Sequence, residues 1–141
     1  MKKTACIILM AVMLIFFTAC GQTNEKVQEA ENMKQASYVN ITAKQAKEIM
    51  DTESGYIILD VRTEEEFEEG HIPGAILIPD YEIKTRAEEI LTDKNQQLLV
   101  YCRSGRRSKL ASEALLDLGY TNIKEFGGII DWPYEVEKQS D

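Results

Sequence analysis

Residues 98–108 read Leu98-Leu99-Val100-Tyr101-Cys102-Arg103-Ser104-Gly105-Arg106-Arg107-Ser108. The apolar residues 98–101 predict a buried strand, and the apolar residues after position 108 recur at helical spacing and predict a helix. Cys102 therefore stands at the end of the strand, where a short loop leads into the helix. Backbone N–H groups of the loop and of the first helical turn would point at the sulfur. Together with the helix dipole and the arginines, they favour the thiolate over the thiol. Because the thiolate is the nucleophilic form, the segment predicts a reactive cysteine.

A second interpretation of Cys102 is a small buried hydrophobic residue, which is common for a free cysteine at a strand end. A core cysteine, however, has no use for three arginines within the next five positions of a chain whose formal net charge is −8. We therefore favour a catalytic Cys102. The expected binding residues are those of the loop that follows, namely Arg103, Ser104, Gly105, Arg106, Arg107 and Ser108.

The first 19 residues have the layout of a secretory signal peptide. Met1-Lys2-Lys3 is a basic start, residues 5–17 are an unbroken apolar run, and small residues lie around position 20. The apolar run is shorter than the roughly 20 residues that a membrane-spanning helix needs. We therefore expect residues 1–19 to be a targeting segment and not part of the fold.

Cys20 stands at the expected cleavage site, after Thr18-Ala19 and before Gly21, and this arrangement is similar to a bacterial lipobox. The resemblance implies cleavage before Cys20 and lipid attachment to its thiol. The protein would then be extracytoplasmic and lipid-anchored to the bacterial cell membrane. Phe17 occupies a position where this pattern more often has leucine, and the alternative is an ordinary signal peptide in which Cys20 has no role.

Length and composition set further bounds. In a chain of 141 residues we expect one domain at residues 37–141, joined to the signal by a polar, flexible tether at residues 20–36. Loss of Lys2 and Lys3 with the signal would take the formal net charge from −8 to −10, which argues against nucleic acid as a partner and against electrostatic binding to anionic lipid. Of the three cysteines only Cys102 would remain free in the domain, so no disulfide framework is expected. With His71 as the single histidine, a histidine-rich metal site is excluded by count, and we expect neither metal nor cofactor.

Strand and helix patterns alternate along the domain. Apolar runs predict strands at residues 38–41, 56–61, 75–78, 97–101 and 123–126. Helices are predicted after capping residues Thr42 and Thr63, over residues 80–91 and after the cysteine loop, and a frayed short helix is predicted after residue 133. Ile90 belongs to the expected apolar face of the helix at residues 80–91, and Leu110 to that of the helix after the cysteine loop. A sharp turn is expected at residues 127–128. The alternation predicts an α/β fold with a mainly parallel sheet flanked by helices on both faces, in which ligands bind beyond the carboxyl ends of the strands.

Several segments together resemble a single-domain rhodanese, a thiosulfate sulfurtransferase-like protein, over about residues 38–133. They are residues 59–62 (LDVR), Glu66-Phe67, residues 70–75 (GHIPGA), residues 101–108, and Gly127-Gly128 followed by Trp132. The resemblance implies a five-stranded parallel sheet and a cysteine that carries sulfur as a persulfide. Cys102 would attack a small sulfur-donor anion such as thiosulfate, release sulfite, and pass the sulfur to a thiol or cyanide acceptor.

The loop residues suit this chemistry. The N–H groups of residues 103–108 would cradle the anionic persulfide, and the arginines would attract an anionic donor and stabilise charge on the leaving sulfite. Gly105 would let the loop close without a side chain in the cradle. Asp60 and Arg62 resemble structural parts of the family pattern. The alternative is that these two residues orient the cysteine loop electrostatically. His71 is expected to form a hydrogen-bonded turn.

Two other classes of function remain open. Cysteine phosphatases and arsenate reductases also place a thiolate in an arginine-bearing loop, but with five residues between cysteine and arginine; here four residues separate Cys102 from Arg107. The tighter loop suits one sulfur atom better than a phosphate. The other class is a surface-anchored sulfur carrier or interaction module without efficient turnover. The sequence gives no indication of the oligomeric state.

Overall fold

The structure is a computed structural model that describes residues 37–138. The predicted signal peptide (1–19), the tether (20–36) with the expected lipid site Cys20, and residues 139–141 lie outside the described residues. Within residues 37–138, no helix has the length and apolar character needed to cross a membrane.

One parallel sheet forms the centre of the domain. Its strands are β1 (Val39–Asn40), β2 (Tyr56–Asp60), β3 (Ile76–Leu77), β4 (Gln97–Cys102) and β5 (Ile123–Gly128). They lie in the order β1-β5-β4-β2-β3, and every neighbouring pair is parallel. The prediction of a mainly parallel α/β sheet is confirmed, and β4, which leads to Cys102, lies in the middle of the sheet.

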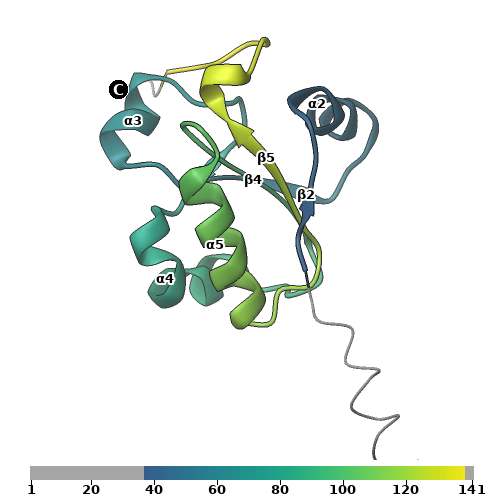
Figure 1. The fold of residues 1–141 in the computed structure, drawn as a ribbon, viewed down its shortest axis with the longest axis vertical. Coiled ribbons are helices and arrows are strands. Elements are labelled where there is room, and N and C mark those ends of the chain that lie inside the picture. The colour runs from purple at the N-terminus through teal and green to yellow at the C-terminus, as the bar shows by residue number, and fades with distance from the viewer. Residues whose placement is uncertain (1–36, 139–141) are drawn as a thin grey trace, which may run out of the picture. The chain divides into compact units, whose positions relative to one another are not determined.

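Helices cover both faces of the sheet. They are α2 (Ala43–Thr52), α3 (Glu64–Glu69), α4 (Ile83–Ile90) and α5 (Arg106–Asp117), with short 3₁₀ turns η1 (Asp80–Glu82) and η2 (Ile129–Asp131). Figure 1 shows α4 and α5 on one side of the sheet and α2 on the other. Thr42 and Thr63 cap α2 and α3 as predicted, each side chain accepting the N–H of the residue three positions on. Both form capping boxes, of which the sequence predicted the one at Thr42.

Side chains of β4 alternate between two cores because successive residues of a strand point to opposite faces. Leu98, Val100 and Cys102 belong to the core beneath α4 and α5. Leu99 and Tyr101 belong to the core on the side of α2. The last residue of β4 therefore directs its thiol toward the side of the sheet from which α5 begins.

Some expectations about the helices are wrong. Ile90 is 39% exposed and Leu110 is 51% exposed, although the sequence pattern assigns both to apolar stripes. Ile90 ends α4 and the neighbouring Leu91 is buried, while Ala111 and Leu115 are the α5 residues that belong to the core. The segment expected to be one helix over residues 80–91 begins as the 3₁₀ turn η1 and becomes α-helical only at Ile83.

The last part of the domain also differs from expectation. Gly127 and Gly128 end β5 and do not form a sharp turn. Val100 pairs with Glu125 but Cys102 pairs with Gly128, so β5 contains one more residue than β4 over this stretch, as in a β-bulge. No helix follows residue 133 within the described part of the chain. Instead, Glu137 pairs with His71 through two backbone hydrogen bonds of 2.8 Å, which satisfy the groups that a helix would have paired.

Candidate active site

Cys102 lies at the carboxyl end of β4, with only 1% of its surface exposed. The next three residues form a short loop, and α5 begins at Arg106 directly after Gly105. Gly105 has φ 98°, a left-handed conformation that glycine adopts without strain, and its N–H points at Cys102 Sγ over 3.1 Å. The loop thus turns backbone donors and the N-terminus of α5 toward the sulfur, as the sequence predicted.

The pKa of the Cys102 thiol lies below its ordinary value. Burial raises this pKa, but the side-chain contact between Sγ and Ser108 Oγ, together with hydrogen bonds from the backbone N–H groups of Ser108, Gly105 and Ser104, outweighs burial. Hydrogen bonds that are stronger to the anion than to the neutral thiol favour ionisation. A thiolate held by backbone donors at a helix N-terminus is a nucleophile and is also part of an anion-binding cradle.

Ser108 connects the cysteine to a residue that the sequence did not reveal. Its buried Oγ lies 3.4 Å from Cys102 Sγ and 2.6 Å from Oε1 of Glu125 on β5. Glu125 is itself 2% exposed and also accepts the N–H of Gly127 over 2.9 Å. A glutamate is typically solvent-exposed, and the pairing of Glu125 with Ser108, 17 residues away in sequence, distinguishes it.

Glycines bring the end of β5 against the cysteine loop. A Cβ atom on Gly128 would lie 2.1 Å from the carbonyl oxygen of Arg103 and 2.5 Å from Cα of Ser104. A Cβ on Gly105 would lie 3.5 Å from Cα of Gly127. Of the two glycines at which the sequence predicts a turn, Gly128 therefore provides the space that the backbone of the cysteine loop occupies.

The three arginines of the loop occupy different environments. Arg107 donates two hydrogen bonds, of 2.7 and 2.8 Å, to the carboxylate of Glu66 on α3, and both side chains are partly buried. Hydrogen bonding to Arg107 lowers the pKa of Glu66 to about 2, against the opposing effect of burial. Arg103 and Arg106 are exposed, on either side of Gly105. The charge of Arg107 is therefore shared with Glu66, while Arg103 and Arg106 are exposed to solvent.

Asp60 and Arg62 form a buried ion pair on the opposite side of the sheet. Their closest atoms, Arg62 Nη2 and Asp60 Oδ2, are 2.7 Å apart, and the same Nη2 donates to the carbonyl of Gly70 over 2.8 Å. Asp60 is in register with Tyr101, whose ring belongs to the core on the side of α2, whereas Cys102 belongs to the other core. The structure thus brings this pair beside the strand that carries the cysteine but not beside its sulfur.

His71 forms the hydrogen-bonded turn that the sequence suggested. Its Nδ1 lies 2.9 Å from the carbonyl oxygen of Phe67, and its ring stacks on the ring of Phe67 at a centroid distance of 3.7 Å. Its Nε2 lies 3.4 Å from a carboxylate oxygen of Glu137. These contacts fix the connection between α3 and β3.

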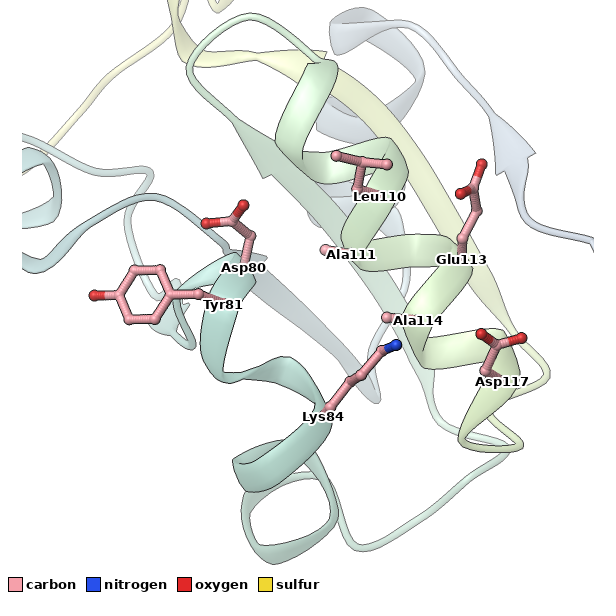
Figure 2. Close-up of a pocket in the computed structure, with 8 residues that line it drawn as sticks. All are labelled: Asp80, Tyr81, Lys84, Leu110, Ala111, Glu113, Ala114 and Asp117. Carbon is pink, nitrogen blue, oxygen red and sulfur yellow. The ribbon is translucent and has the colours of Figure 1, made fainter.

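A separate hollow of about 430 Å³ lies between η1, α4 and α5 (Figure 2). The residues that line it are Asp80, Tyr81, Lys84, Leu110, Ala111, Glu113, Ala114 and Asp117. Figure 2 shows Lys84 directed across the hollow toward α5. None of these residues belongs to the cysteine loop, and none carries a nucleophilic thiol. Among residues 37–138, no group of three or more histidine, cysteine or acidic side chains is arranged to hold a metal ion.

The fold and the loop define a parallel α/β protein with a buried cysteine whose sulfur faces backbone N–H groups at a helix N-terminus. Residues 42–133 match the Rhodanese-like domain family, and the chain belongs to this family. Thiosulfate sulfurtransferase PspE of Escherichia coli (strain K12) is 42% identical over 73 residues, which cover 52% of this chain and 70% of PspE. YrkF of Bacillus subtilis (strain 168), named as a candidate sulfur carrier protein, is 35% identical over 103 residues, but this chain spans only 55% of it.

Solved structures agree with the family assignment. A rhodanese with anions from E. coli aligns with a TM-score of 0.56 at 38% identity, covering 60% of this chain and 99% of that one. The Alr3790 protein from Anabaena sp. aligns with a TM-score of 0.65 at 27% identity, covering 70% of this chain and 91% of that one. The five-stranded parallel sheet with its flanking helices is therefore the rhodanese-like fold.

Proposed function

We propose that this protein is a sulfurtransferase that moves sulfane sulfur from an anionic donor such as thiosulfate to a thiol or cyanide acceptor through a persulfide on Cys102. The observation that carries the proposal is the position of Cys102 Sγ, at the end of β4 and 3.1 Å from the N–H of Gly105. Its lowered pKa supplies the thiolate that such a reaction needs. The likeness to PspE, which is named as a thiosulfate sulfurtransferase, supports thiosulfate as the donor.

The reaction balances without an added oxidant. The Cys102 thiolate attacks the outer sulfur of thiosulfate, an S–S bond to Sγ forms, and the S–S bond of the donor breaks. The electron pair of that bond leaves with sulfite. A thiolate or cyanide acceptor then attacks the outer sulfur of the persulfide, and the Cys102 thiolate is restored as the leaving group.

The loop residues have distinct roles in this proposal. The N–H groups of Ser104, Gly105 and Ser108, which stabilise the thiolate, would hold the anionic outer sulfur of the persulfide. Arg103 and Arg106, both exposed, would attract the anionic donor and stabilise the leaving sulfite. Arg107 would act mainly by holding the start of α5 against Glu66, because both of its terminal nitrogens already donate hydrogen bonds to that carboxylate.

Intact-mass spectrometry after incubation with thiosulfate tests the proposal. The wild-type chain should gain about 32 Da, one sulfur atom, and lose it when cyanide is added. Cys102→Ser should remain unmodified, because a hydroxyl does not form a persulfide, and circular dichroism should show that its fold is unchanged. An adduct that persists in Cys102→Ser would place the chemistry elsewhere. Turnover of an aryl phosphate together with no sulfur adduct would favour the phosphatase class.

A sulfur carrier is the second candidate, favoured by the likeness to YrkF and by the deep burial of Cys102. A carrier loads one sulfur atom per chain and releases it slowly, whereas an enzyme forms many equivalents of thiocyanate. The amount of thiocyanate formed per chain with excess thiosulfate and cyanide distinguishes the two.

We also propose that the protein is extracytoplasmic and anchored to the bacterial cell membrane through lipid on Cys20. The support is the sequence around residues 1–21, with its basic start, its apolar run and its small residues beside the cysteine. Residues 20–36 would then be the tether between the lipid and the domain.

A further inference from the structure

Glu125 is a buried carboxylate that the sulfur-transfer steps do not use. It lies on β5, and its Oε1 accepts the N–H of Gly127 and, over 2.6 Å, the hydroxyl of Ser108. The same hydroxyl oxygen lies 3.4 Å from Cys102 Sγ. Contacts between three side chains therefore lead from the thiol to a buried carboxylate.

The direction of the Ser108 hydroxyl decides how much it can stabilise the thiolate. A serine hydroxyl has a single hydrogen, and Ser108 Oγ has several acceptors within reach. Glu125 Oε1 is at 2.6 Å, the carbonyl oxygen of Gly105 is at 3.1 Å, and the Gly127 carbonyl and the Cys102 sulfur are both at 3.4 Å. The carboxylate is the nearest acceptor, and hydrogen bonds to ionised acceptors are roughly twice as strong as neutral ones. The hydrogen therefore points toward Glu125.

We propose that Glu125 is a positioning residue that draws the Ser108 hydroxyl away from Cys102 and so keeps the thiolate less stabilised and more nucleophilic. The inference rests on the proposed role of Cys102 as the nucleophile. Nucleophilicity of a thiolate falls as its pKa falls, so a cradle with every donor aimed at the sulfur would ionise the cysteine but weaken its attack. The negative charge of Glu125 acts in the same direction, because like charges disfavour ionisation.

The other charged groups near these three residues come from elements packed around them. Arg107 on α5 interacts favourably with the Cys102 thiolate. Tyr38, next to β1, lies within electrostatic range of Glu125 and of Glu113 on α5. A change confined to position 125 leaves all of these groups in place.

Glu125→Gln is the direct test, because glutamine keeps an acceptor for Gly127 and Ser108 but removes the charge. The alkylation rate of Cys102 by iodoacetamide and the ultraviolet absorbance of its thiolate are followed against pH in the full chain, with Cys102→Ser subtracted. In Glu125→Gln we expect the midpoint of the Cys102 titration, in both the alkylation rate and the thiolate absorbance, to move to lower pH than in the wild type. For a tenfold stabilisation of the thiolate, the two rate profiles cross: the variant is about threefold faster below both midpoints and about threefold slower above them. Partial unfolding would not produce this crossing.

Ser108 provides the matched controls. In a Ser108→Ala background the shift caused by Glu125→Gln should be smaller, and in a Ser108→Thr background, which retains the hydroxyl, it should be restored. An equal shift in all three backgrounds would mean that Glu125 acts by charge alone and would overturn the role of Ser108. An unchanged midpoint in folded Glu125→Gln, with circular dichroism as the check, would overturn the inference altogether.

The two proposals fail in different ways, since alkylation requires no sulfur donor. A shifted alkylation profile without any persulfide in the wild type would contradict the proposed sulfur transfer and leave the role of Glu125 standing. Normal persulfide formation with an unchanged profile would contradict only the role of Glu125.

Discussion

At the scale of single residues, the carbonyl oxygen of Arg103 restricts position 128 to glycine. A Cβ atom there would lie 2.1 Å from this oxygen, which is far inside any normal contact. Gly128 has φ −133°, an extended conformation open to any residue, so the restriction comes from space and not from torsion. Gly127 is the opposite case, with φ 88° and, apart from its chain neighbours, no atom within 4 Å of the place that a Cβ would occupy.

This contrast predicts different outcomes for two neighbouring substitutions. Gly128→Ala should lower the free energy of unfolding by about 3 kcal/mol, because the backbone of the cysteine loop must move, and should prevent persulfide formation. Gly127→Ala should cost only about 1–2 kcal/mol from its left-handed conformation. Urea unfolding measures the stabilities, and the mass shift after thiosulfate measures loading. Similar losses in both variants would contradict the steric explanation.

At the scale of elements, the pair between Glu66 and Arg107 joins α3 to the start of α5. Through this link the short acidic helix helps to hold the helix whose N-terminus faces the thiol. The pKa of Glu66 in the folded protein, about 2, lies below its ordinary value of 4.5. The unfolded chain therefore binds a proton more readily than the folded one, and the pair stabilises the fold at pH values above about 4.5.

Glu66→Gln should therefore lower the free energy of unfolding at neutral pH by about 2 kcal/mol. The difference from wild type should shrink as the pH falls through 4.5 and disappear near 2, because the wild-type carboxylate is then protonated as well. Glutamine can still accept the N–H of Thr63, so the cap of α3 is retained. Urea unfolding at several pH values checks this, and a difference that stays constant down to pH 3 would contradict it.

The sequence predicts elements well where one local signal determines them. Thr42 and Thr63 mark helix starts, and the apolar runs of β2 and β4 mark strands buried on both faces. The position of Cys102, at the end of β4 and shortly before α5, follows from the same reasoning. Contacts between distant residues are harder to predict. The bulge at the end of β5, the pairing of Glu137 with His71, and the buried Glu125 all depend on partners that only the folded sheet brings together.

At the scale of the whole molecule, the acidic chain and its proposed lipid determine where sulfur transfer would take place. The formal net charge of −8 gives the protein no electrostatic attraction to anionic lipid. Under the proposed anchoring, membrane binding would come from acyl chains on Cys20, and more than one chain would be needed for stable anchoring.

Cys20→Ala should therefore move the protein from the membrane pellet to the soluble fraction when cells are fractionated. Cys6→Ala is the matched control, because Cys6 lies inside the predicted signal and should leave fractionation unchanged. Urea unfolding of the released protein should match that of the wild type. A Cys20→Ala protein that stays in the membrane pellet would contradict the lipid anchor.

The donors that surround Cys102 have a consequence for how this protein can evolve. They are largely backbone N–H groups, and every substitution except proline retains the N–H of its position. Within the loop, only Gly105, at φ 98°, is tied to one residue type. Mutations at the exposed positions 103, 104 and 106 can therefore alter which molecules are attracted to the loop, while the backbone N–H groups around Cys102 are retained. If Cys102 transfers sulfur as proposed, new substrate preferences can arise in such a protein without first passing through an inactive form.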